Sequence, residues 1–297
     1  MTKILSDLGR LKLIKDQGVF KPNSLQLAPT DKCNLNCSFC SVQKRIGATM
    51  VYEDVIKAVD DFVDLNLKTV EITGGGEPCL YPEINELITY CYDKGLKIGF
   101  ISNGVLLNKK LTRDSFEKLT WLRVSMNALE YAGDFELDIP ENVTLGLSYV
   151  WTDKSSEAKL LWIDKYKKQY DAQYVRVVPN CLNRKDMDYF KKKIAPIVNK
   201  YDGFFPQSKE YTKPDRCWFG YLKPFLNSDG YIYHCSAIPL IHRKFASRFR
   251  MGHWSEIKKI WSAPIAFDTG PCDKCFFRIQ NDVIEALLTK GEHEDFI

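Results

Sequence analysis

Between residues 24 and 202 the chain alternates between short apolar runs and longer stretches in which apolar residues recur every three or four positions. The short runs are typical of buried strands, and the longer stretches have the period of amphipathic helices. The predicted strands are residues 25–29, 69–73, 98–102, 122–126, 144–150 and 174–178, and the predicted helices are residues 53–65, 82–94, 109–119, 156–170 and 185–200.

Strands that alternate with helices in this way predict an α/β fold with a parallel sheet and right-handed crossovers. Pro82 suits the first turn of a helix, and Gly95 suits the position just after one. In parallel sheets the functional residues lie at the carboxyl ends of the strands. Cysteines, a glycine-rich turn and small polar residues follow the predicted strands, so we expect one site at that edge of the sheet.

The pattern changes after Tyr201. Residues 203–240 are rich in proline, glycine and aromatic residues and predict loops with a β-hairpin, whose turn lies at residues 227–230. We therefore expect two domains, a larger one over residues 1–204 and a smaller one over residues 205–297.

Composition narrows the class of protein. The chain has 297 residues, of which 45% are hydrophobic and 27% charged, as in soluble globular proteins. It has no apolar stretch long enough to cross a membrane and no secretory signal at its N-terminus. Ten cysteines without a signal favour metal or redox chemistry in a reducing compartment, so we expect a cytoplasmic protein. The net charge of +4 favours an ordinary surface over polyanion binding.

Three cysteines, Cys33, Cys37 and Cys40, follow the first predicted strand with the spacing C-x3-C-x2-C. A [4Fe–4S] cluster normally takes four cysteine ligands. Three cysteines leave one iron open, and that iron can bind an exogenous ligand directly. The alternative interpretation of the spacing is a zinc knuckle.

The glycine-rich turn follows the second predicted strand and includes Gly75-Gly-Glu-Pro78. With this turn and with Phe39 just before the last cysteine of the triad, the chain resembles the radical S-adenosylmethionine (SAM) superfamily over residues 24–180. The resemblance implies a partial (β/α)6 barrel, a cluster with an open iron site and SAM as cofactor.

The resemblance also implies which residues contact SAM. The glycine-rich turn would hold the methionyl amine, with the Glu77 carboxylate pairing the ammonium group. Phe39 would lie near the adenine, and polar residues that end two strands would contact the carboxylate and ribose. The family often has Ser-x-Asp where this chain has Ser125-Met-Asn127. The predicted cofactor-binding residues are Phe39, Gly74, Gly75, Gly76, Glu77, Ser102, Asn103, Ser125 and Asn127.

Four further cysteines, Cys217, Cys235, Cys272 and Cys275, lie in the predicted smaller domain. Four thiolates complete either a tetrahedral zinc site or an Fe–S cluster, and spacing alone does not separate the two. The run C-x12-G-x4-C resembles the opening of the SPASM and twitch extensions of radical SAM enzymes. The tail is similar in length and cysteine spacing to aminoglycoside alcohol dehydrogenases of the butirosin pathway. The resemblance implies a small hairpin-plus-helix extension of the twitch type with one auxiliary [4Fe–4S] cluster.

Two other features carry candidate chemistry. Cys181 follows the last predicted strand, where it can donate a hydrogen atom to a substrate radical, although a packed thiol is the commoner role of such a residue. The segment 241–250 has four Lys or Arg residues and two interleaved phenylalanines. Such a segment suits a nucleotide, DNA or another phosphorylated substrate, against the alternative of a solvated surface.

The resulting functional hypothesis is a radical SAM enzyme that makes a 5′-deoxyadenosyl radical and abstracts hydrogen from its substrate. The substrate radical is then oxidised or rearranged, which makes the protein an oxidoreductase or an isomerase. We expect a polar small-molecule or nucleotide-type substrate, with a peptide or a nucleic-acid base as alternatives, and a one-electron donor such as flavodoxin or ferredoxin. The non-enzymatic alternative is an Fe–S or zinc binding protein.

Overall fold

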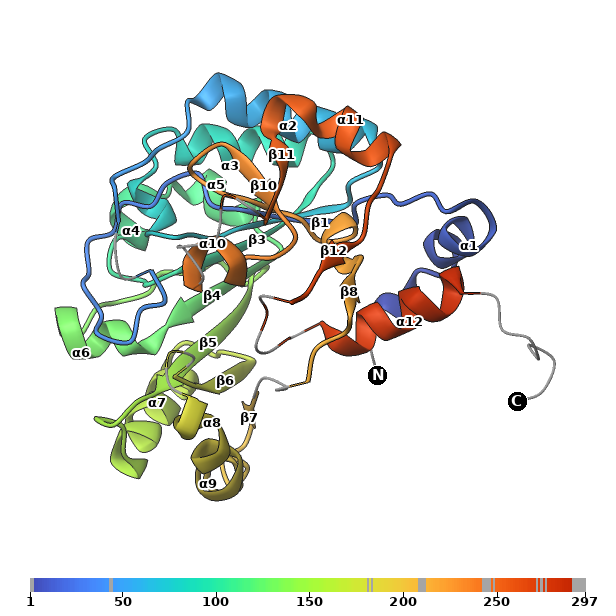
Figure 1. Cartoon of the computed structure of the whole chain (residues 1–297). Coiled ribbons are helices and arrows are strands. Elements are labelled where there is room, and N and C mark those ends of the chain that lie inside the picture. The colour runs from blue at the N-terminus through green and yellow to red at the C-terminus, as the bar shows by residue number, and fades with distance from the viewer. Residues whose placement is uncertain are drawn as a thin grey trace.

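A ten-stranded sheet forms the centre of the molecule, with the strand order β11-β10-β9-β1-β2-β3-β4-β5-β6-β7 (Figure 1). The computed structural model describes residues 3–42, 45–180, 182, 184–207, 212–241, 247, 249–270, 272, 275 and 277–289. From β1 to β7 every neighbouring pair of strands is parallel. The predicted α/β class with a parallel sheet is therefore confirmed.

The strands agree closely with the predicted ones. A seventh parallel strand was not predicted, because its three residues are too few to show a period and end in proline. The parallel strands are β1 (Ser24–Leu27), β2 (Thr69–Ile72), β3 (Lys97–Ser102), β4 (Trp121–Ser125), β5 (Thr144–Trp151), β6 (Tyr174–Pro179) and β7 (Phe204–Pro206).

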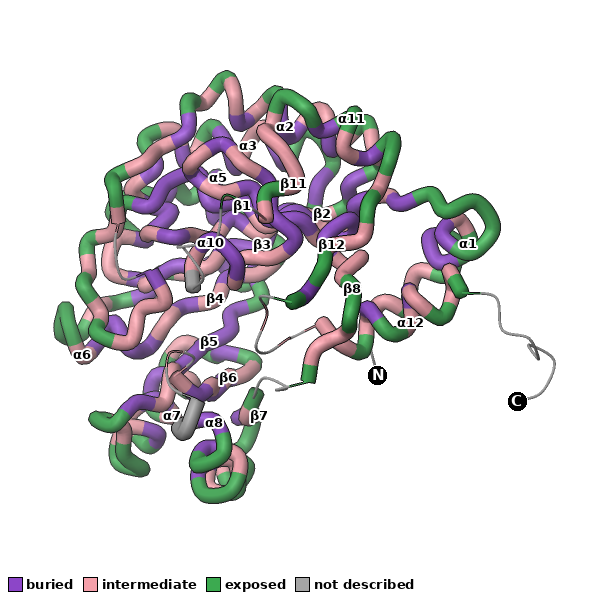
Figure 2. The backbone as a smooth tube through the Cα atoms, in the orientation of Figure 1, coloured by how far each residue is buried: buried purple, intermediate pink, exposed green. Residues whose placement is uncertain are grey.

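The helices of the parallel part connect consecutive strands and bury one apolar side against the sheet, while exposed residues gather on their outward sides (Figure 2). They are α2 (Tyr52–Asp64), α3 (Ile84–Asp93), α4 (Leu107–Lys110), α5 (Arg113–Glu117), α6 (Leu129–Ala132), α7 (Glu157–Gln169), α8 (Arg184–Tyr189) and α9 (Ala195–Val198).

Two predicted helices are broken. The stretch 109–119 divides into α4 and α5, because the side chain of Thr112 caps α5 by accepting a hydrogen bond from the backbone of Ser115 at 3.2 Å. The stretch 185–200 includes a π-helical turn, Phe190–Ile194, between α8 and α9. Pro196 lies just after that turn and has no amide proton to continue the regular series of hydrogen bonds.

Three strands of the tail extend the same sheet. Strand β9 (Phe225–Leu226) pairs in parallel with β1, and the antiparallel strands β10 (Tyr231–Tyr233) and β11 (Arg250–His253) follow. The predicted hairpin turn joins β9 to β10, where the amide of Gly230 donates to the carbonyl of Asn227 at 2.9 Å. The predicted boundary near residue 205 stays a prediction, since main-chain hydrogen bonds of this sheet involve both sides of it.

The other tail elements lie against the parallel part. Helix α12 (Arg278–Leu288) packs beside α1 (Leu8–Gln17), and α11 (Ile257–Ser262) packs beside α2 (Figure 1). The remaining elements are α10 (Ala237–Ile241) and a separate pair of short strands, β8 (Arg216–Cys217) and β12 (Phe267–Asp268). In the part of the chain that the structure describes, no helix is long and apolar enough to span a membrane.

Side chains alternate across the sheet, and this alternation defines an inner face. In β2, β4 and β6, every second residue is buried against the helices and the residues between them are half-buried on the opposite side. Glu71 on β2, Arg123 on β4 and Arg176 on β6 all occupy half-buried positions on this inner face.

Candidate functional site

The cysteine triad lies on the loop between β1 and α2, at the carboxyl end of β1. All three thiols are half-buried. The amide of Cys40 donates to the carbonyl of Cys37 at 3.0 Å, and the amide of Leu35 donates to the Cys33 sulfur at 3.5 Å. The Arg45 guanidinium donates to the Cys40 sulfur at 3.1 Å. Donors aimed at sulfur stabilise thiolates, so the loop suits thiolate ligation of a metal centre.

The thiols of the triad also influence one another electrostatically. Burial raises the pKa of Cys33, and burial together with the neighbouring thiols Cys40 and Cys33 raises the pKa of Cys37 to about 11. A cationic metal centre would lower these pKa values, because it stabilises the thiolate form and the thiol protons are released to solvent. The donor set therefore fits a group that three thiolates hold together.

Among the described residues, no three His, Cys, Asp or Glu side chains converge as they would around a single metal ion. A [4Fe–4S] cluster does not need such convergence, because each cysteine ligates a different iron. The three thiol donors and their position on one loop fit such a cluster.

The glycine-rich turn after β2 lies directly against the cysteine loop. The amide of Glu77 donates to the carbonyl of Lys32 at 2.7 Å, one residue before Cys33. A Cβ atom on Gly76 would lie 2.0 Å from the same carbonyl oxygen, so only glycine allows this approach. Arg45 adds a second link, a 3.3 Å hydrogen bond from its side chain to the carbonyl of Gly75. The predicted cluster loop and the predicted SAM turn thus form one unit.

The carboxylate of Glu77 points into the protein. Its side chain is buried, and its oxygens accept hydrogen bonds from the Cys79 amide at 3.1 Å, the Ser102 hydroxyl at 2.8 Å and the Asn103 amide at 2.7 Å. Burial raises its pKa, whereas these three donors lower it. Through the hydrogen bonds from Ser102 and Asn103, the Glu77 carboxylate connects the turn after β2 to the end of β3. The predicted pairing of Glu77 with the SAM ammonium group stays a prediction, and the geometry offers the carboxylate a positioning role instead.

Asn103 joins the end of β3 to the cysteine loop. Its side-chain amide donates to the Asn34 side chain at 2.7 Å and lies 3.9 Å from the Cys33 sulfur. The hydroxyl of Ser102 is already engaged, since it also accepts from the amide of Gly104 at 2.9 Å. Of these two predicted contacts, Asn103 is the half-buried one beside the thiols.

The two predicted contacts after β4 differ. Ser125 is half-buried at the end of the strand. The Asn127 side chain is buried, and it both donates to the carbonyl of Val150 at 3.0 Å and accepts from the amide of Val150 at 2.7 Å. Asn127 therefore holds β5 against the end of β4, and both polar ends of its amide group are occupied.

Phe39 lies half-buried on the cysteine loop, with its ring centroid 6.3 Å from that of Tyr131 on α6. The Tyr131 hydroxyl accepts a hydrogen bond from the amide of Ser38 at 3.0 Å. Three residues of this region, Tyr131, Arg45 and Asn34, were not predicted to belong to the site. Arg45 alone had a signal, since a cation follows the last cysteine of the triad by five positions; the contacts of Tyr131 arise only from folding.

In the tail, the thiols of Cys217, Cys235 and Cys275 come close enough to act on one another. Burial and the neighbouring Cys235 and Cys275 thiols raise the pKa of Cys217 to about 12. The amide of Phe277 donates to the Cys275 sulfur at 3.2 Å, in the same i+2 relation as Leu35 and Cys33. Cys272, the fourth predicted ligand, is half-buried near the end of the β12 segment.

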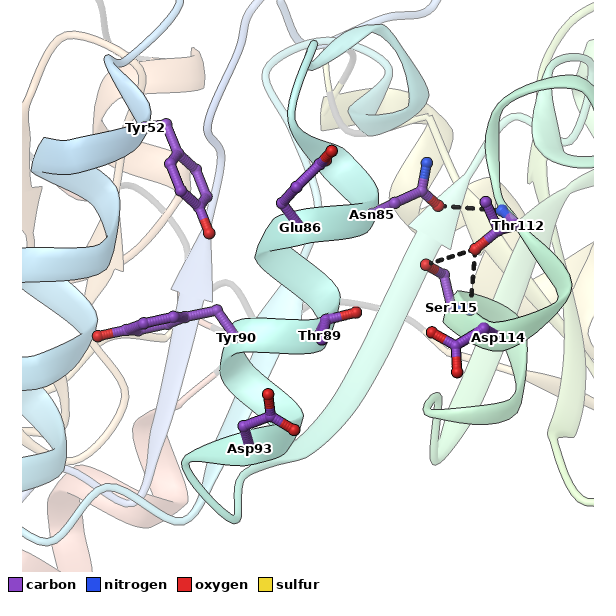
Figure 3. A pocket seen from close by; sticks show the side chains of 9 residues that line it. All are labelled: Tyr52, Asn85, Glu86, Thr89, Tyr90, Asp93, Thr112, Asp114 and Ser115. Atoms are coloured by element: carbon purple, nitrogen blue, oxygen red, sulfur yellow. Dashed lines mark hydrogen bonds between the residues drawn. The ribbon is translucent and has the colours of Figure 1, made fainter.

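The predicted hydrogen donor and most of the predicted basic segment cannot be placed relative to this site. Cys181 lies outside the described residues, as do residues 242–246 and 248 of the basic segment. A surface hollow between α2, α3 and α5, lined by residues such as Tyr52, Glu86 and Thr112, contains none of the predicted site residues (Figure 3).

Comparison with known proteins finds a family model that matches the first strands of the parallel sheet. Residues 27–132 match the family model described as the radical SAM superfamily. Over 111 residues the chain is 31% identical to a probable GTP 3′,8-cyclase of Methanococcus maripaludis, and the match covers 36% of this chain and 37% of that relative. The chain thus spans little more than a third of that relative's length.

Two solved structures share the fold. SuiB of Streptococcus suis superposes with a TM-score of 0.61 at 14% identity, over 88% of this chain and 71% of SuiB. The protein anSMEcpe, solved with bound AdoMet and a Cp18Cys peptide, superposes with a TM-score of 0.54 at 15% identity, over 93% of this chain and 86% of that one. The triad and the glycine-rich turn both lie within residues 27–132, the segment of this chain that matches the radical SAM superfamily model.

Proposed function

We propose that this chain is a radical SAM enzyme that holds a [4Fe–4S] cluster with Cys33, Cys37 and Cys40 and binds SAM beside it. When bound, the cluster supplies one electron that cleaves SAM to methionine and a 5′-deoxyadenosyl radical, which abstracts hydrogen from the substrate. The observation that carries this proposal is the hydrogen bond between the Glu77 amide and the Lys32 carbonyl, which docks the glycine-rich turn onto the cysteine loop.

The chain's own residues position these groups. Arg45 stabilises the Cys40 thiolate and ties it to the glycine-rich turn. The carboxylate of Glu77 orients Ser102 and the Asn103 amide, so it acts on the SAM site through them. Phe39 offers a half-buried ring for the adenine. For the remaining SAM contacts we favour Gly74, Gly75, Gly76, Asn103 and Ser125 over the fully engaged Asn127.

For the tail we propose one auxiliary [4Fe–4S] cluster of the twitch type, held by Cys217, Cys235, Cys272 and Cys275. Its support is the proximity of three of these thiols and the amide that donates to the Cys275 sulfur. A cluster ligated by four cysteines has no iron free for substrate, so we assign it an electron-transfer or structural role. The specific likeness to the butirosin-pathway dehydrogenases stays a prediction.

For the substrate we favour a polar small molecule of the nucleotide type. The support is that relatives named GTP 3′,8-cyclase match 36% and 37% of this chain. A peptide is the second candidate, because SuiB has been solved with a precursor peptide, although that likeness extends to the fold alone. The substrate radical is then rearranged or oxidised, and a flavodoxin or ferredoxin supplies the electron for SAM cleavage.

The decisive experiment measures 5′-deoxyadenosine formed from SAM by anaerobically reconstituted protein with a chemical reductant. The wild type should form it, and Cys40→Ala should not, because one iron ligand is lost. Cys91→Ala is the matched control, since Cys91 is a buried thiol of α3 far along the chain from the triad. Reconstituted wild-type protein that carries the cluster but leaves SAM intact would refute the proposal.

A further inference from the structure

Two arginines, Arg123 on β4 and Arg176 on β6, lie half-buried on the inner face of the sheet. In the described part of the chain, neither forms an ion pair with a carboxylate. Arg176 donates one hydrogen bond to the Gln207 side chain at 3.2 Å, and its Nε atom is buried without a partner. Arg123 donates to the Tyr174 hydroxyl at 3.3 Å, and its guanidinium lies 5.0 Å from the centroid of Trp121.

The nearby acid is already neutralised. Glu71 forms an ion pair with Lys223 at 2.6 Å and accepts from the Gln26 side chain at 3.1 Å. Burial and the positive charge of Arg123 lower the pKa of Arg176 to about 10, and Tyr174 and Glu71 offset this only partly. Among the residues that the structure describes, the inner face therefore holds two guanidinium groups without an ion-paired carboxylate, since Glu71 is engaged by Lys223.

A buried arginine with a purely structural role looks different in this same protein. Arg10 is buried, and its side chain bonds the Asp7 carboxylate at 2.9 Å as well as the carbonyls of Lys21 and Pro22. The Asp7 carboxylate neutralises the charge of Arg10, and the two carbonyls accept hydrogen bonds from its guanidinium group. Among the described residues, Arg176 has one neutral acceptor for its five donor positions, which leaves donors of its guanidinium group open to a ligand.

The two arginines also lie beside the proposed SAM site. Ser125, at the end of β4, pairs in register with Ser148 on β5, and Ser148 pairs with Arg176 on β6. Two strand spacings separate Ser125 from Arg176, which is about 10 Å. Arg123 lies two residues before Ser125 on β4, and both side chains are on the inner face. A substrate held here would be within reach of a radical formed beside Ser125.

Two glycines, Gly99 and Gly146, allow aromatic rings to lie directly against the backbone of the inner face. The Trp121 ring lies across Gly99, where a Cβ atom would be 2.2 Å from the ring, and the Tyr174 ring lies across Gly146, where a Cβ atom would be 2.1 Å away. These rings support Arg123 from both sides, one by stacking and one by its hydroxyl. Arg123 is thus held in place without being neutralised.

We propose that Arg123 and Arg176 form the binding site for an anionic group of the substrate, a phosphate or a carboxylate. The inference rests on the proposed function and names the substrate class: a molecule that carries an oxyanion about one nucleoside length from the carbon that loses hydrogen. Guanidinium groups bind both oxyanions through two parallel hydrogen bonds, which explains why arginine is used here instead of lysine.

The test is equilibrium binding of two probes, inorganic pyrophosphate and citrate, to the full chain with its clusters reconstituted. We expect the wild type to bind one of them, and Arg123→Met and Arg176→Met each to weaken that binding about tenfold or more. Arg113→Met is the matched control, because Arg113 is an exposed arginine of α5 that pairs with Glu117, and it should bind as the wild type does. Preference for pyrophosphate would identify a phosphate group, and preference for citrate a carboxylate.

A further variant addresses folding. Arg176→Lys keeps the charge and loses the planar fork, so it should retain weakened binding even if Arg176→Met fails to fold. Failure of both probes to bind the wild type, or an equal loss in Arg113→Met, would overturn the inference. Formation of 5′-deoxyadenosine from SAM is measured in parallel: its presence without anion binding refutes this site alone, and its absence refutes the proposed function alone.

Discussion

The amide of Glu77 donates a 2.7 Å hydrogen bond to the carbonyl of Lys32, and this bond joins two loops that are far apart in the sequence. Lys32 precedes the first cysteine of the triad, and Glu77 ends the glycine-rich turn. The position of the cysteines relative to the turn is therefore determined by backbone contact, independently of any bound group.

Gly76→Ala tests this contact. The new methyl group would lie 2.0 Å from the Lys32 carbonyl oxygen, so the turn must move away from the cysteine loop. We expect lower iron content after reconstitution and loss of SAM binding, although no iron ligand has changed. For iron content, Gly75→Ala is the matched control, because a Cβ atom on Gly75 would come no closer than 3.4 Å to any neighbouring atom. Equal iron contents in the two variants would show that the close approach is unimportant.

Glu77→Gln tests the buried carboxylate. One oxygen becomes an NH2 group that faces a donor, so we expect a loss of about 1–3 kcal/mol in the free energy of unfolding. The wild type should also show a distinct pH dependence. Burial raises the pKa of Glu77, so the folded state binds the proton more tightly than the unfolded state does. Protonation of Glu77 therefore adds to the free energy of unfolding of the wild type as the pH falls towards 4.5, the ordinary pKa of a glutamate. This added stability is lost as the pH rises through the pKa of the folded state.

Thermal unfolding at several pH values measures the difference in stability between the wild type and Glu77→Gln. The melting temperature of the wild type relative to that of Glu77→Gln should rise as the pH is lowered. A difference that stays constant with pH would mean that the carboxylate titrates alike in the folded and unfolded chain.

The strands and helices of the parallel part could be predicted because the apolar and polar residues within each of them repeat with the period of a strand or a helix. Strand β2, for example, was expected at residues 69–73 and spans Thr69–Ile72. The partners of functional side chains could not be predicted in this way. The three donors to Glu77 include Ser102 and Asn103, which approach it only after β2 and β3 have paired. Likewise, alternation places Arg123 on one face of a strand but does not show that it faces Arg176 without a carboxylate between them.

Asn127→Asp restores the acid that the family often has at this position. Here the residue donates to the Val150 carbonyl, and a carboxylate at that place would face an acceptor without a proton between them. We expect a loss of stability of roughly 2 kcal/mol or more, seen in denaturant unfolding, with SAM affinity unchanged in the folded fraction. A change in SAM affinity without a loss of stability would instead place Asn127 in contact with the cofactor.

The tail cysteines provide the last prediction, which separates the two metal interpretations of the second site. Two clusters require about eight irons per chain, and Cys275→Ala should leave about four, because the triad is untouched. The Cys275 sulfur accepts the amide of Phe277 and influences Cys217, so its removal affects the tail thiols directly. Cys79→Ala is the control, since Cys79 is a buried thiol outside both sets. Metal analysis of anaerobically purified protein decides the outcome. If the wild type instead contains about one zinc and four irons, and Cys275→Ala loses the zinc alone, the tail holds a structural zinc ion, and an electron-transfer role for the tail is refuted.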